Sequence, residues 1–141
     1  MIKIAPLAAA VAASVALLST AAAASTQRTS ASTNVAVTLG KPAEFHIGVP
    51  TSARAGKITF NVKNAGKIVH EFTVIKTAKA AAKLPVSGGL ASETGAKGGS
   101  EDVGAGASKS FSVTLPTGHY AVICNIAGHY VGGMRQDFTV R

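Results

Sequence analysis

Residues 115–141, LPTGHYAVICNIAGHYVGGMRQDFTVR, hold two short segments typical of β-strands, 119–124 and 136–141, on either side of a glycine-rich loop. The turn sequence Pro116-Thr117-Gly118 precedes the first segment. The loop contains the only cysteine of the chain and one of its two methionines. This stretch therefore predicts a strand–loop–strand unit whose loop concentrates the sulfur and imidazole side chains of a chain that is otherwise poor in them.

Alternation of apolar and polar side chains continues outside this unit. It is clearest at 57–63, where Ile58, Phe60 and Val62 face one way and polar side chains face the other. Turn residues separate the segments, which are predicted as strands at 34–39, 44–49, 57–63, 69–77, 109–115, 119–124 and 136–141. About seven short strands with regular turns indicate an all-β protein, a β-sandwich.

Residues 76–106, KTAKAAAKLPVSGGLASETGAKGGSEDVGAG, interrupt this pattern. Ala and Lys favour a short helix over 76–84, ended by Pro85, although a helix of this length is marginal without packing. The remainder is rich in Gly, Ser and Ala and has little to bury. We expect a long excursion at one side of the sandwich, disordered towards its C-terminal half.

Cys124, His129 and Met134 are spaced C-x4-H-x4-M in the loop. Cys124 shares strand parity with Tyr120 and Val122, and a lone buried cysteine is most often a small apolar core residue. The histidine and methionine that follow favour a metal site instead, because their spacing lets one loop fold back around a central point. Gly128, Gly132 and Gly133 supply the backbone freedom for that fold.

A fourth ligand is predicted upstream, at His70. This residue begins a strand after the turn at 64–66, and its parity places it with Phe72 and Val74 on a core face. His46 and His119 have the parity of solvent-facing side chains, so neither is expected to bind metal.

The chemistry of this ligand set favours copper. Thiolate and thioether are soft donors, and two imidazoles with one thiolate and a weak axial methionine form the blue-copper arrangement. Zinc sites seldom use a thioether, and an iron–sulfur cluster needs more thiolates. One mononuclear copper ion, cycling between Cu(I) and Cu(II), is therefore predicted.

The run at 115–140 resembles the C-terminal strand–loop–strand of the cupredoxins, the plastocyanin/azurin-like type 1 blue copper proteins, including their P-x-G-x-Y-x-x-x-C approach to the ligand cysteine. NVKNAGKIVHEFTVI, residues 61–75, is similar to their first-ligand strand. The resemblance implies a Greek-key sandwich with His70, Cys124 and His129 as equatorial ligands and Met134 as the axial one. Glu71 departs from the family, where a small polar residue often follows the first histidine, and leaves open how this strand is tied to the cysteine loop.

The resemblance also implies that His129 is the ligand nearest solvent and gives an edge for electron entry and exit. A small apolar docking patch would surround it, with simple loop packing as the alternative. The residues of this patch are Ile126, Ala127, Tyr130 and Val131.

The N-terminus has the order of a secretory signal peptide. Met1-Ile2-Lys3 is basic, 4–18 is apolar, and the small residues up to Ala24 end in an A-x-A-like site. We predict a signal peptide at 1–24, a flexible segment at 25–33 and a copper-binding domain at 34–141. The protein is then periplasmic or secreted, and it would associate with a membrane only if the segment stayed uncleaved.

The chain carries 14 Lys+Arg against 6 Asp+Glu, a formal net charge of +8. This balance favours redox protein partners with acidic docking surfaces and salt-sensitive association. Nucleic acid is not expected, because there is no dense basic block. We expect a monomer.

Three functions are compatible with these features. A one-electron carrier is favoured, because four protein ligands leave no open position for a substrate, unlike an enzyme. Copper storage or delivery to an exported copper enzyme is the alternative, although a closed thiolate site exchanges metal slowly. A metal-free immunoglobulin-like interaction domain would leave the Cys-His-Met loop unexplained.

Overall fold

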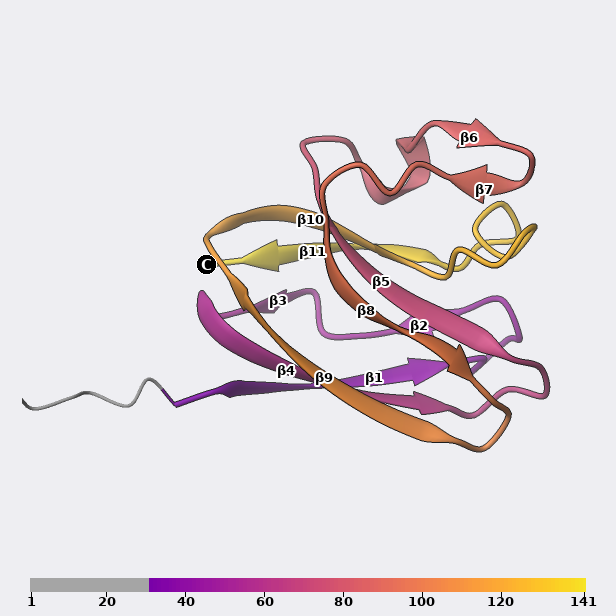
Figure 1. Ribbon diagram of the computed structural model, residues 1–141, viewed down its shortest axis with the longest axis horizontal. Coiled ribbons are helices and arrows are strands. Elements are labelled where there is room, and N and C mark those ends of the chain that lie inside the picture. Colours follow the sequence, from indigo (N-terminus) through magenta and orange to yellow (C-terminus); the bar gives the residue numbers. More distant parts are fainter. Residues whose placement is uncertain (1–30) are drawn as a thin grey trace, which may run out of the picture.

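The computed structural model describes residues 31–141, which form a sandwich of two β-sheets (Figure 1). The four-stranded sheet has the order β2-β1-β4-β9. In it β1 runs parallel to β4, and the other pairs are antiparallel. Its strands are β1 (Thr33–Leu39), β2 (Ile47–Gly48), β4 (Gly56–Asn64) and β9 (Ser108–Leu115).

The five-stranded sheet has the order β3-β11-β10-β5-β8, with β10 at its centre between β11 and β5. A separate hairpin and one turn of 3₁₀-helix lie between β5 and β8 in the sequence. These elements are β3 (Ser52–Ala53), β5 (His70–Lys76), η1 (Ala81–Lys83), β6 (Val86–Ser87), β7 (Leu90–Ala91), β8 (Ala96–Val103), β10 (Gly118–Ile123) and β11 (Arg135–Val140). The all-β prediction is confirmed.

The core between the sheets follows the predicted alternation. Ile58, Phe60 and Val62 of β4 are all buried, as are Phe72 and Val74 of β5. The Phe60 ring lies at the centre of an aromatic group, with centroids 5.3–5.8 Å from three other phenylalanine rings, those of Phe72, Phe111 and Phe138. Burial of these large side chains supplies most of the driving force that holds the two sheets together.

The predicted signal peptide at 1–24 and most of the predicted flexible segment lie outside the described residues. Thr33, the last residue of that segment, already pairs with Ile58 as the first residue of β1. Within 31–141, no helix is long and apolar enough to cross a membrane.

The expectation of disorder towards the end of 76–106 is wrong, because residues 96–103 form β8 and pair with β5. The sequence does not predict this strand because Gly98 and Gly99 have no side chains and so hide the alternation of apolar and polar residues. A β-carbon at Gly99 would collide with the backbone oxygen of Phe72, so the close approach of the two strands requires glycine there. The ring of Phe111 lies against Gly98 and fills the space that a side chain would otherwise take.

The predicted helix at 76–84 is also wrong. Lys76 ends β5, and only Ala81–Lys83 is helical, as a single 3₁₀ turn. Ala81 and Leu84 are instead buried in a second, smaller apolar cluster, with Ala121 and Ile123 from the outer face of β10. Burial of this face outweighs the helix propensity of Ala and Lys, because a helix this short is marginal by itself. We call residues 77–95 the covering segment.

The predicted strand at 44–49 is shortened to Ile47–Gly48. Glu44 and Phe45 lie in a turn instead. The Glu44 carboxylate accepts hydrogen bonds from the backbone of Lys67 and Ile68, which bends the chain towards the turn after β4.

Candidate metal centre

Three predicted ligands converge at one end of the sandwich. His70 begins β5, Cys124 directly follows β10, and His129 lies in the loop between β10 and β11. Nδ1 of His70 lies 3.2 Å from Nδ1 of His129, and that nitrogen lies 3.3 Å from Sγ of Cys124. All three donor atoms lie within 4.8 Å of one another, and all three side chains are buried.

These separations suit a shared metal ion. A first-row ion binds imidazole nitrogen at about 2.0 Å and thiolate sulfur at about 2.3 Å. Donors on one trigonal or tetrahedral ion are then about 3.3–3.7 Å apart, by the geometry of those bond lengths. The observed 3.2 and 3.3 Å are close to these values. The donor set therefore fits a mononuclear site, and its softness favours copper over zinc.

The Cys124 sulfur is hydrogen-bonded to the backbone of β5, the strand that begins with His70. The N–H of Glu71 donates to Sγ at 3.2 Å. The sequence left open how the strand after His70 is linked to the cysteine loop when Glu71 replaces a small polar residue. The main-chain N–H of Glu71 makes this link, so it does not depend on the side chain at position 71. Burial raises the pKa of the Cys124 thiol, and the backbone N–H groups of Glu71 and Ile126 act in the opposite direction. A bound metal would hold the sulfur as thiolate.

His129 is positioned by tight turns within the loop. Its N–H donates to the Ile126 carbonyl, and the Met134 N–H donates to the His129 carbonyl, so the loop folds back on itself as predicted. Gly128 and Gly133 have φ of 88° and 122°, conformations that favour glycine. Burial and the neighbouring His70 lower the pKa of His129, which favours the neutral imidazole that a metal binds.

Met134 is buried at the same end of the sandwich as the three converging side chains. Its side chain is fully buried in the cluster that contains Cys124, and its carbonyl accepts the Cys124 N–H at 3.1 Å. This bond places the two residues opposite each other, at the start and end of the loop.

The chain was compared with known proteins. No protein-family model matches it, and no curated protein matches it. Among solved structures, rusticyanin from Thiobacillus ferrooxidans is 19% identical, with 78% of this chain and 77% of that chain covered and a TM-score of 0.64. Auracyanin from Roseiflexus castenholzii is 21% identical over 78% of this chain and 96% of that chain, with a TM-score of 0.57.

The chain has the cupredoxin fold. Auracyanin B is a further similar structure, 22% identical over 77% of this chain and 88% of that chain, with a TM-score of 0.59. At these identities the likeness concerns the fold, so the chemistry of this cupredoxin-like site is argued from its own residues.

The other two histidines lie away from the cluster, as predicted. His46 is exposed. His119 is partly exposed, with Nδ1 2.7 Å from the Thr77 carbonyl and Nε2 2.9 Å from Asp137 Oδ1. Neither belongs to the group of converging donors.

The predicted docking patch needs one correction, at Tyr130. This side chain is only 3% exposed, and its hydroxyl donates to the Ala81 carbonyl at 2.6 Å and accepts the Leu84 N–H at 3.1 Å. It therefore anchors the covering segment rather than facing a partner. Ala127 is exposed and Val131 is 55% exposed, while Ile126 packs partly against the core.

Phe45 is an aromatic residue of this surface that the sequence analysis missed. It is 42% exposed, and its ring meets the ring of His129 edge-on at a centroid distance of 5.1 Å. His129 itself is 8% exposed, whereas His70 and Cys124 are fully buried. His129 is thus the most accessible of the three predicted ligands that converge.

The covering segment is also hydrogen-bonded to residues 124–134, which we call the ligand loop because they include three of the predicted ligands. Asn125, next to Cys124, exchanges two hydrogen bonds with the backbone of Ala91, and the Gly128 N–H donates to the Gly89 carbonyl. Figure 1 shows the β6–β7 hairpin lying beside the loop that joins β10 and β11. Both sides of the loop are therefore supported, by the core and by the covering segment.

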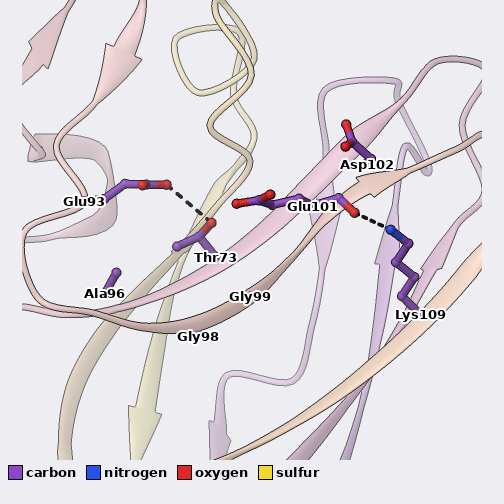
Figure 2. Close-up of a pocket in the computed structure, with 8 residues that line it drawn as sticks. All are labelled: Thr73, Glu93, Ala96, Gly98, Gly99, Glu101, Asp102 and Lys109. Atoms are coloured by element: carbon purple, nitrogen blue, oxygen red, sulfur yellow. Dashed lines mark hydrogen bonds between the residues drawn. The ribbon is translucent and has the colours of Figure 1, made fainter.

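A hollow on the β5–β8 surface contains none of the predicted ligands (Figure 2). Its side chains include Glu93, which accepts from the Thr73 hydroxyl at 3.5 Å, and Lys109, which donates to the Glu101 carbonyl at 2.7 Å. Together with Asp102, the acidic groups here raise the pKa of the nearby Glu71, after the larger effect of its burial.

Glu44 is the second residue of the site that sequence reasoning missed. Its Oε1 lies 2.9 Å from Nε2 of His70, on the side of the ring opposite the cluster. No spacing or motif links positions 44 and 70, so only the folded chain reveals the contact.

Proposed function

We propose that this chain is a mononuclear type 1 copper protein that carries single electrons between redox partners. The observation that supports it best is the buried convergence of His70 Nδ1, Cys124 Sγ and His129 Nδ1. We assign these three as equatorial ligands and Met134, on the same closed loop, as the weak axial ligand.

A copper ion held there would supply a one-electron couple. The residues of the chain contribute the rest. Burial of the ligands excludes water, and the bonds that fix Cys124 and His129 in place limit rearrangement between oxidation states. The His129 ring, the ligand with the most solvent exposure, gives the route for electrons, with Phe45 and Val131 beside it as part of an apolar contact surface.

The solved structures are consistent with this proposal. Rusticyanin is described as a copper protein, and both rusticyanin and auracyanin are described in reduced forms. We extend these properties to the present chain, together with export to the periplasm or medium after removal of 1–24. The net charge of +8 favours acidic redox partners.

Addition of Cu(II) to the purified metal-free protein tests the proposal. One equivalent should produce an intense blue charge-transfer band and the paramagnetic-resonance spectrum of a type 1 centre. Ascorbate should bleach the band and oxidant should restore it with copper retained. A pale, weakly bound adduct would contradict the proposal.

Copper storage or delivery is the second candidate, because the same ligands could serve it. The two functions differ in how readily Cu(I) leaves the site. A carrier should retain Cu(I) against a modest competing chelator over many redox cycles, whereas a delivery protein should lose it. The closed, doubly supported loop favours the carrier.

A further inference from the structure

The contact between Glu44 and His70 joins an anionic carboxylate to a candidate copper ligand. His70 is fully buried, and its two ring nitrogens face different partners. Nδ1 faces the His129 nitrogen at 3.2 Å, and Nε2 faces Glu44 Oε1 at 2.9 Å. An ionised carboxylate accepts hydrogen bonds but cannot donate one. The proton of the neutral ring therefore belongs on Nε2, which leaves the Nδ1 lone pair directed at the cluster.

The carboxylate is itself held rigidly. The Lys67 N–H lies 2.9 and 3.0 Å from its two oxygens, and the Ile68 N–H lies 3.3 Å from Oε1. Both carboxylate oxygens thus accept backbone N–H groups, which fixes the carboxylate beside the His70 ring and leaves Oε1 to accept the Nε2–H.

The turn after β4, which supplies these N–H groups, allows the Glu44 carboxylate to approach its backbone closely. Gly66 donates its N–H to Asn64 Oδ1 at 2.8 Å, and a β-carbon at Gly66 would collide with Glu44 Oε1. Asn64 is buried and donates through Nδ2 to the carbonyls of Ile68 and Val103, both at 2.7 Å. Glu44 is partly exposed, but the turn at 64–68 holds its carboxylate in one position against His70.

We propose that Glu44 is a positioning residue that fixes the tautomer of His70 and makes the site favour Cu(II) over Cu(I). This inference rests on the proposed copper function. Carboxylate–histidine–metal chains raise the donor strength of the imidazole. The higher-charged Cu(II) gains more from a stronger donor and a nearby negative charge than Cu(I) does. The reduction potential is therefore lower than it would be with a neutral residue at position 44.

Glu44→Ala and Glu44→Gln test the proposal in the full mature chain. Cu(II) and Cu(I) dissociation constants are measured separately by chelator competition, and the reduction potential by redox titration. Loss of such a contact typically costs about 10–100-fold in metal affinity. We expect this loss for Cu(II) in Glu44→Ala and a smaller one for Cu(I). Each tenfold difference between them raises the potential by about 59 mV.

Glu44→Gln separates charge from position. It keeps an oxygen that can accept the His70 Nε2–H but removes the negative charge, so we expect an intermediate rise in potential. Glu101→Gln is the control, because it removes a carboxylate that bonds to none of the ligands and should leave both affinities within about twofold. If Glu44→Ala does not fold, the Gln variant carries the test. An unchanged potential, or equal weakening of both oxidation states, would overturn the proposal.

Nitrogen-15 NMR of the metal-free protein distinguishes this failure from failure of the copper function. The wild-type chain should show His70 protonated at Nε2, and Glu44→Ala should show a mixture of tautomers. The same tautomer in both proteins would overturn the role of Glu44 even if copper binds. A wild-type protein without a blue centre would contradict the copper function instead.

Discussion

Replacement of Tyr130 by phenylalanine tests whether the covering segment stabilises the ligand loop. The change removes only a hydroxyl, but that hydroxyl donates to the Ala81 carbonyl and accepts the Leu84 N–H. Each lost hydrogen bond costs about 1 kcal/mol, and stranding its buried partner adds to the cost. We expect Tyr130→Phe to lower the free energy of unfolding by about 2–4 kcal/mol, or roughly 10–20 °C in Tm for a domain of this size.

The chain offers a matched control in Tyr120→Phe. Its hydroxyl donates one hydrogen bond, to the Pro116 carbonyl at 2.8 Å, at the opposite end of β10 from the loop. We expect a loss of about 1 kcal/mol there and no change in metal release. Urea unfolding of the metal-free proteins gives the stabilities, and transfer of copper to a chelator gives the release rates. If Tyr130→Phe matched wild type in stability and release, the covering segment would not support the loop.

Three further substitutions address the ligands and their surroundings. Cys124→Ser should abolish the blue absorption while the far-ultraviolet circular dichroism stays that of the sandwich, and a blue variant would remove Cys124 from the site. Met134→Leu should keep the colour of the Cu(II) form and raise the potential in a redox titration, because the axial donor is lost while the trigonal donors remain; a Cu(II)-loaded variant that is colourless, or one that is unfolded, would contradict this. Glu71→Gln should stabilise the metal-free protein by about 0.5 kcal/mol at low salt and less at high salt in urea titrations, because it removes a charge that is partly desolvated and is repelled by Glu101, Asp102 and Glu93. Destabilisation at low salt would show that the Glu71 carboxylate has an attractive role.

Side-chain alternation was sufficient to predict those strands that have one buried and one solvated face. β4 is the clearest case, because Ile58, Phe60 and Val62 are buried and Lys57, Asn61 and Lys63 are exposed. The convergence of His70 with Cys124 and His129 was also predictable, since parity placed His70 and Cys124 on core faces and the loop spacing brought His129 back towards Cys124. The assignment of these residues as copper ligands stays a proposal.

What the sequence did not reveal depends on contacts between distant segments. β8 lacks alternation because Gly99 accommodates the backbone of β5 and Gly98 accommodates the ring of Phe111. The role of Tyr130 required knowing that the outer face of β10 is covered. One signal for this was present in Ala121-Val122-Ile123-Cys124, because a continuous apolar run indicates a strand buried on both faces. Glu44 had no such signal.

The bonds between the covering segment and the ligand loop have a consequence for protein engineering. Residues 124–134 would not keep their shape if they were transplanted alone into another β-sandwich, since Asn125, Gly128 and Tyr130 would arrive without Ala91, Gly89 and Ala81. The exchangeable unit is therefore discontinuous, and a working graft has to import 77–95 together with the loop.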